Sequence, residues 1–173
     1  GLKVLSYQLD LPLLSHLLLR PDVRVIRLRR RNLLETAVST LVAQQTGLWK
    51  TWDHDGPLEE RYHALEPIPV ADVEEMVRYT RVRLDEVDEI LDGRDGPTLR
   101  IDYEDLYLHD TERVLASLWS FLGVPAPSDE RLAYYLDPAQ VQMARPETYG
   151  RVPNIAEIEA ALGGDDVGHL TYL

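Results

Sequence analysis

The sequence predicts an α/β fold in which helices flank a parallel sheet. Strand-like and helix-like segments alternate along the chain, and the helical segments carry recognisable start and stop signals. The composition agrees, since 45% hydrophobic and 28% charged residues over 173 positions are typical of one globular domain with one core. The sequence contains no internal repeat, low-complexity tract or long linker, so we expect a single domain over residues 1–173.

The first predicted strand and helix are adjacent. Val23–Leu28 (VRVIRL) is β-branched and apolar, which favours a strand. Asn32 with Glu35 three residues later is a capping-box pattern, and it predicts a helix over 33–46. Gly47 follows as a helix stop.

An irregular connection over Trp49–Val70 separates this helix from the next one. Asp72 and Glu75 form the predicted capping pair of the second helix, and Gly93 is its stop. Apolar residues between them recur at helical spacing, which makes this the clearest helix in the sequence.

The last third of the chain repeats the alternation. Thr98–Tyr103 (TLRIDY) is predicted as a short strand, and Asp110 as the cap of a helix that ends at Gly123. Two further short helices are expected, over Ser128–Tyr135 and over Asn154–Leu162. Asn154 and Glu157 form a capping box for the last of them.

Charge and residue usage exclude several classes of function. The net charge of −12 disfavours a nucleic-acid partner. The chain has no cysteine and no apolar run near the roughly 20 residues of a membrane span, so we expect a cytoplasmic protein without a span. The five histidines lack the short spacings of metal ligands, and we expect no metal.

The positive charge is concentrated at one place. Six arginines fall within the twelve residues 20–31, which contain a single acid, Asp22. Arg31 ends the predicted strand, Asn32 begins the helix, and Ser39 lies two turns into it. A guanidinium, exposed helix amides and a hydroxyl can converge there on a phosphate. In the alternative interpretation the arginines solvate an edge strand, and Arg31 pairs with Glu35.

Several segments, which form three blocks in the family's order, resemble the sulfotransferase family. Val25–Ser39 (VIRLRRRNLLETAVS) is similar to its 3′-phosphate-binding segment, in which a serine follows an arginine by eight residues. Ala43–Trp49 (AQQTGLW) resembles the bacterial nodulation-factor and trehalose sulfotransferase branch. Tyr103–Leu106 (YEDL) with Phe121–Val124 (FLGV) resembles a later strand-to-helix block, and Val152–Leu162 (VPNIAEIEAAL) resembles the family's tail.

The resemblance implies transfer of a sulfuryl group from 3′-phosphoadenosine-5′-phosphosulfate (PAPS) to a hydroxyl of a sugar or natural product, without a metal. Arg31 and Ser39 would hold the 3′-phosphate of this co-substrate. Arg145, Tyr149 and Arg151 stand where the family's late loop reaches the nucleotide, although the RKG triplet of animal cytosolic members is not present.

The resemblance also implies a three-layer P-loop-type fold that opens with a strand, a phosphate-cradling loop and a helix. We expect this chain to lack that opening, and Gly1–Gln8 to be the strand that follows it. No catalytic residue is assigned, because Leu5 stands where some relatives carry a histidine base. The catalytic group is expected upstream of Gly1.

Two other functions are weighed against this one. The first is a non-catalytic nucleotide-binding or interaction domain derived from the same fold. The second is a kinase of the related P-loop group, which needs a GxxxxGK[ST] loop that the sequence does not contain. The identity of the acceptor and the oligomeric state, including a homodimer, stay open.

Overall fold

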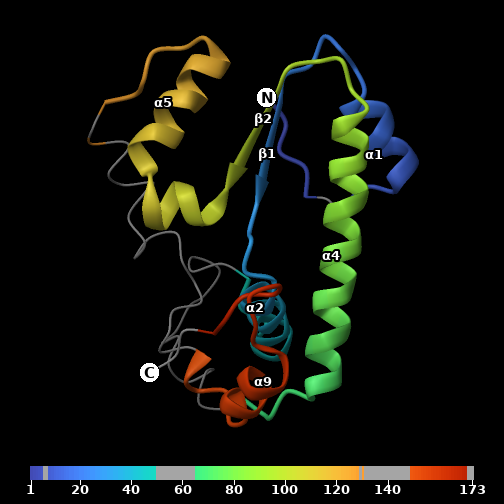
Figure 1. Cartoon of the computed structure of the whole chain (residues 1–173), viewed down its shortest axis with the longest axis vertical. Helices are drawn as coiled ribbons and strands as arrows, with labels where there is room; N and C mark the ends of the chain where they lie inside the picture. The colour runs from blue at the N-terminus through green and yellow to red at the C-terminus, as the bar shows by residue number, and fades with distance from the viewer. Residues whose placement is uncertain (6–7, 50–64, 129, 131–148, 171–173) are drawn as a thin grey trace. The chain divides into compact units, whose positions relative to one another are not determined.

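The computed structural model describes residues 1–5, 8–49, 65–128, 130 and 149–170. Along these residues two strands are interspersed among helices (Figure 1). The elements, with η1 a π-helical turn, are α1 (Leu11–Leu18), β1 (Val25–Arg29), α2 (Leu33–Thr46), α4 (Val70–Asp92), β2 (Thr98–Asp102), η1 (Asp105–His109), α5 (Thr111–Leu122) and α9 (Ile155–Leu162).

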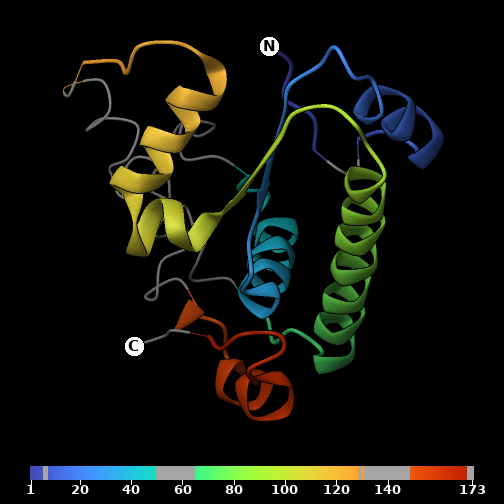
Figure 2. The same cartoon turned by 45° about the horizontal axis from the view of Figure 1, so that its top comes forward.

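The two strands form a small parallel sheet. Val25 is in register with Thr98 and Arg29 with Asp102, and both views show β1 and β2 side by side (Figures 1 and 2). The protein is therefore a mixed helix and strand structure with a parallel strand pair, which is compatible with the predicted α/β class.

The chain divides into two compact units. Unit 1 comprises Gly1–Arg30 with Tyr79–Ala126, and unit 2 comprises Arg31–Arg78 with Pro127–Leu173. Helix α4 contributes to both units, because the boundary falls within it. The prediction of a single domain over 1–173 stays a prediction.

Unit 1 is organised around a small apolar cluster and a buried arginine. Leu14 of α1 packs with Val87 and Leu91 of α4. The guanidinium of Arg94, which follows α4, donates five hydrogen bonds that connect the end of α1, the approach to β1 and the start of β2. Its acceptors are Leu18 O at 2.7 Å, Arg20 O at 2.9 Å, Val23 O at 2.8 Å, Pro97 O at 2.6 Å and Thr98 Oγ1 at 2.7 Å.

Strand β1 turns its charged face inward. The side chain of Arg27 is buried, whereas Ile26 and Leu28, which point to the opposite face, are 40% and 52% exposed. Asp88 of α4 explains this arrangement, because its carboxylate oxygens lie 2.7 Å from Nε and 2.7 Å from Nη2 of Arg27. Burial lowers the pKa of the Arg27 guanidinium, and the charge of Asp88 opposes that shift.

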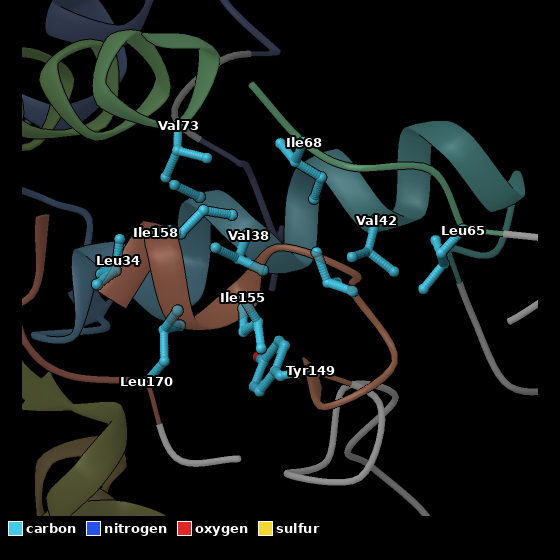
Figure 3. Close-up of a cluster of buried hydrophobic side chains, with 12 residues drawn as sticks. Leu34, Val38, Val42, Leu65, Ile68, Val73, Tyr149, Ile155, Ile158 and Leu170 are labelled. Carbon is cyan, nitrogen blue, oxygen red and sulfur yellow. The ribbon is translucent and has the colours of Figure 1, made fainter. Parts of the chain in front are cut away.

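Unit 2 contains the larger core (Figure 3). Four apolar residues of α2 are buried there, and they pack against α9, the start of α4 and Tyr149. The buried members of the cluster are Leu34, Ala37, Val38, Val42, Leu65, Ile68, Val73, Tyr149, Ile155, Ile158, Val152 and Leu170.

Helix α2 has the predicted bounds, and its signals act as predicted. The side chain of Asn32 caps the helix, with its Oδ1 accepting from Glu35 N at 2.9 Å. Gly47 ends the helix with a φ of 72°, a left-handed conformation that favours glycine. In α5, Gly123 ends the helix in the same way with a φ of 69°.

Two helix starts use their polar residues differently from the prediction. Helix α4 begins at Val70, so Asp72 lies in its first turn and is not the cap. The amide of Asp72 donates to Pro69 O at 3.0 Å. Helix α5 begins after Asp110 as predicted, but the Asp110 carboxylate pairs with Arg113 and makes no capping hydrogen bond.

Near the N-terminus the structure differs from the prediction in two ways. Helix α1 was not predicted, although Asp10 caps it through a hydrogen bond from Leu13 N at 2.8 Å. The predicted strand over Gly1–Gln8 is absent from its described residues. Here Leu5 O accepts from Gln8 N at 2.9 Å, and Leu5 N donates to the Gln8 side chain, so a local turn uses groups that a strand would offer to a neighbour.

The two strands also differ slightly from their predicted limits. β1 begins at Val25, two residues later than predicted, and β2 ends at Asp102, so that Tyr103 lies beyond it. Within the irregular connection, 65–69 are without helix or strand, and 50–64 lie outside the described residues. Most of the helix predicted over Ser128–Tyr135 also lies outside them.

Asn154 precedes α9 as predicted, but its side chain does not cap that helix. It binds both backbone groups of Ile68, accepting from Ile68 N at 2.9 Å and donating to Ile68 O at 2.8 Å. This pair of hydrogen bonds satisfies the backbone of a residue whose side chain is 1% exposed.

Replacing Asn154 by alanine should therefore lower the free energy of unfolding by about 1–3 kcal/mol, because two buried backbone groups lose their partners. Asn154→Asp keeps the acceptor and loses the donor, and should cause a smaller loss. Urea denaturation measures both effects. A loss below about 0.5 kcal/mol for the alanine variant would contradict the bridging role of this side chain.

Candidate functional site

The segment singled out by the sequence lies at the start of unit 2. β1 ends at Arg29, Arg31 precedes the cap of α2, and Ser39 lies within that helix. The side chain of Arg31 is exposed, and that of Ser39 is partly buried beside the apolar stripe. The predicted order of strand, arginine and helix is thus present.

The backbone amides at the start of α2 are used by the protein itself. Glu35 N donates to the Asn32 side chain, Thr36 N donates to Asn32 O at 3.2 Å, and Leu34 N donates to Val167 O at 3.0 Å. The expectation that exposed backbone amides donate hydrogen bonds to an anion is therefore wrong for these three amides. An anion at this position depends instead on the side chains of Arg31 and Ser39.

The hydroxyl of Ser39 differs from the other hydroxyls of α2. Thr36, Thr40 and Thr46 each donate to the carbonyl four residues earlier, at 2.9, 2.8 and 2.8 Å. Among the described residues the Ser39 hydroxyl makes no such hydrogen bond. It is therefore the α2 hydroxyl best suited to contact a ligand.

The three remaining predicted site residues are placed differently from one another. Tyr149 is 0% exposed and its ring packs in the core of unit 2 (Figure 3). Arg151 is partly buried in the turn before α9, and Arg145 lies outside the described residues. A nucleotide contact by these residues stays a prediction, while the position of Tyr149 defines a packing role for its ring.

Tyr103 and Glu104, which follow β2, make contacts within unit 1. Arg30 lies over the ring of Tyr103, with its guanidinium carbon 4.9 Å from the ring centroid. The rings of Tyr103 and Tyr107 are 4.7 Å apart. Glu104 is buried, and its charge contributes to raising the pKa of Arg29, for which the hydrogen bond to Asp102 is the main cause.

Unit 1 contains a charged cavity that sequence reasoning missed. It has a volume of about 460 Å³, and four arginines balance four aspartates among its lining residues. Arg29 Nε lies 2.6 Å from Asp102 Oδ1, and Arg100 Nη2 lies 2.5 Å from Asp92 Oδ1. The sequence signal for this cavity is the charged residues at alternate positions of β1 and β2, which place them on one face of the sheet. Because they cancel, the cavity has no formal charge that attracts a polyanion.

Two other kinds of site are absent from the described residues. Within these ranges no three His, Asp or Glu side chains are grouped to hold a metal ion. No helix among them is long and apolar enough to cross a bilayer. These findings apply to the described part of the chain.

Comparisons with known proteins add no further assignment. No protein-family model, curated protein or solved structure matches this chain. The sulfotransferase resemblance therefore stays a prediction from the quoted segments.

Proposed function

We propose that this chain is the nucleotide-binding part of a PAPS-dependent sulfotransferase with a three-layer P-loop-type α/β architecture. The observation that carries the proposal is the start of α2. There an exposed arginine, Arg31, precedes an Asn32-capped helix, and Ser39 presents a hydroxyl two turns along it. The parallel pairing of β1 and β2 is the arrangement that such an architecture requires.

Arg31 and Ser39 hold the 3′-phosphate of the nucleotide in this proposal. A guanidinium makes charge-assisted hydrogen bonds to phosphate, often through two N–H groups at once. The Ser39 hydroxyl adds a neutral donor. Neither group takes part in bond breaking, so both serve to bind and orient the co-substrate.

The proposed reaction moves a sulfuryl group to an acceptor hydroxyl of a sugar or natural product. The acceptor oxygen bonds to sulfur as the bond from sulfur to the 5′-phosphate oxygen breaks, and the acceptor proton passes to a base. Adenosine 3′,5′-bisphosphate leaves with the electron pair of the broken bond. No residue of the chain is assigned as that base.

The proposed setting follows from composition. The net charge of −12 disfavours a nucleic-acid partner and leaves a small molecule or glycan as the acceptor. We also propose a cytoplasmic location and a homodimer. No metal is proposed, because transfer depends on positioning and on donors aimed at the leaving phosphate.

Transfer of labelled sulfate from PAPS to a panel of hydroxylated glycans and natural products tests the proposal. Because no residue of this chain is assigned as the base, the assay uses a protein in which this chain is joined to the group that serves as base. The expected result is labelled product whose formation falls sharply when Arg31 is replaced by alanine. Preferential binding of adenosine 3′,5′-bisphosphate without transfer to any acceptor would instead support the non-catalytic nucleotide-binding domain. Absence of both binding and transfer would contradict both functions.

A further inference from the structure

The segment that follows α9 lies across the start of α2. This segment, Gly163–Leu170, is called the strap below. It folds back on itself, with Gly164 N donating to Gly168 O at 3.1 Å and Gly168 N donating to Gly164 O at 2.7 Å. Both the strap and α2 belong to unit 2.

Two hydrogen bonds connect the strap to α2. Leu34 N donates to Val167 O at 3.0 Å, and Asn32 Nδ2 donates to His169 O at 2.8 Å. The side chain of Asn32 therefore holds the strap with its nitrogen while its oxygen caps the helix. The strap thus constrains the residue that lies between Arg31 and the first turn of α2.

The contact is close enough to require glycine. Gly168 has a φ of 93°, and a Cβ at this position would lie 2.5 Å from Asn32 Oδ1 and 3.1 Å from Asn32 Cα. A side chain here conflicts with both the backbone conformation and the cap.

Glu159 of α9 holds the other side of the strap. Its Oε1 lies 2.7 Å from His169 Nδ1, and its Oε2 accepts from Leu170 N at 2.8 Å. A Cβ at Gly163 would lie 2.4 Å from Oε1 of Glu159, so this glycine leaves room for the carboxylate. The Glu159 side chain is 22% exposed, whereas that of Asp165, the second carboxylate near the imidazole of His169, is fully exposed.

We infer that Glu159 is a positioning residue for the proposed 3′-phosphate site. It fixes the strap, the strap carbonyls fix Asn32 and Leu34, and these in turn set the direction in which Arg31 leaves the start of α2. This inference rests on the proposed function, because it assigns Glu159 a role in binding the same phosphate. Glu159 has no direct contact with the ligand in this account.

The test compares two nucleotides in each variant. Isothermal titration calorimetry gives the dissociation constants of adenosine 3′,5′-bisphosphate and of adenosine 5′-monophosphate. The constant of the monophosphate divided by that of the bisphosphate isolates the contribution of the 3′-phosphate, and this ratio is high when the 3′-phosphate is recognised. We expect Glu159→Ala and Gly168→Ala each to reduce this ratio about five- to tenfold, because a displaced contact loses much of its effect. Glu157→Ala, an exposed change on the same helix, should leave it unchanged.

Each outcome has one meaning. A wild-type ratio near one defeats the proposed function itself. A high wild-type ratio that persists in Glu159→Ala and Gly168→Ala overturns the inference and leaves the proposed function standing, as does a ratio that rises. If Glu159→Ala does not fold, Glu159→Gln replaces it, and this variant should give an intermediate ratio because it keeps one acceptor oxygen.

Discussion

Arg31→Ala should weaken the binding of adenosine 3′,5′-bisphosphate by roughly 10- to 150-fold, which corresponds to about 1.5–3 kcal/mol. The reason is the loss of charge-assisted hydrogen bonds from the guanidinium to the 3′-phosphate. The side chain is exposed in the structure, so part of its charge is screened by solvent, and the effect is smaller than in a buried site. Calorimetric titration measures the change.

A matched control separates local contact from general electrostatics. Arg20→Ala removes the same charge from an exposed site, where Arg20 pairs with Asp22 at 2.6 Å. We expect this variant to bind the bisphosphate like the wild type. Ser39→Ala should cause a smaller loss than Arg31→Ala, because it removes one neutral donor. Equal losses in the Arg20 and Arg31 variants would show that net charge alone drives binding.

Arg94→Ala should lower the free energy of unfolding by about 3–5 kcal/mol. Its side chain is 9% exposed and connects three segments of unit 1 through five hydrogen bonds. Gly96 allows this geometry, because a Cβ there would lie 2.4 Å from Nη2 of Arg94. Truncation leaves a set of backbone carbonyls without their donor and opens a cavity where the guanidinium lay.

The measurement for Arg94 is urea denaturation followed by far-ultraviolet circular dichroism. Arg78→Ala is the control, since Arg78 lies 4.0 Å from Glu75 in an exposed pair on α4. That variant should change the free energy of unfolding by less than about 0.5 kcal/mol. A loss below about 1 kcal/mol for Arg94→Ala would show that water replaces its hydrogen bonds at little cost.

Local sequence signals predict the limits of a helix correctly where residues next to the helix cap its start and end it. Asn32 and Gly47 bracket α2, and the structure keeps both limits. They were insufficient where a polar side chain has a distant partner. The Asn154 pattern predicts a cap, but its amide binds Ile68, which is 86 residues away. The capping pattern does not reveal such a contact, because the side-chain oxygen that would cap the helix can equally accept from a distant backbone amide.

Two other features depend on long-range packing. The sequence analysis does not predict helix α1, because its apolar residues lie on all sides of the helix. Asp10, with Pro12 in the first turn, is nevertheless a usable start signal. The strap could not be predicted from glycines alone. A glycine is needed at position 168 because Asn32, which is distant in the sequence, lies next to it in the structure.

The most direct test of the account compares two ligands on the unaltered chain. Calorimetry of adenosine 3′,5′-bisphosphate and adenosine 5′-monophosphate isolates the recognition of the 3′-phosphate from that of the rest of the nucleotide. We expect the bisphosphate to bind at least about tenfold more tightly than the monophosphate, and Arg31→Ala to remove most of this preference. Equal affinity for the two nucleotides would contradict a 3′-phosphate site at the start of α2.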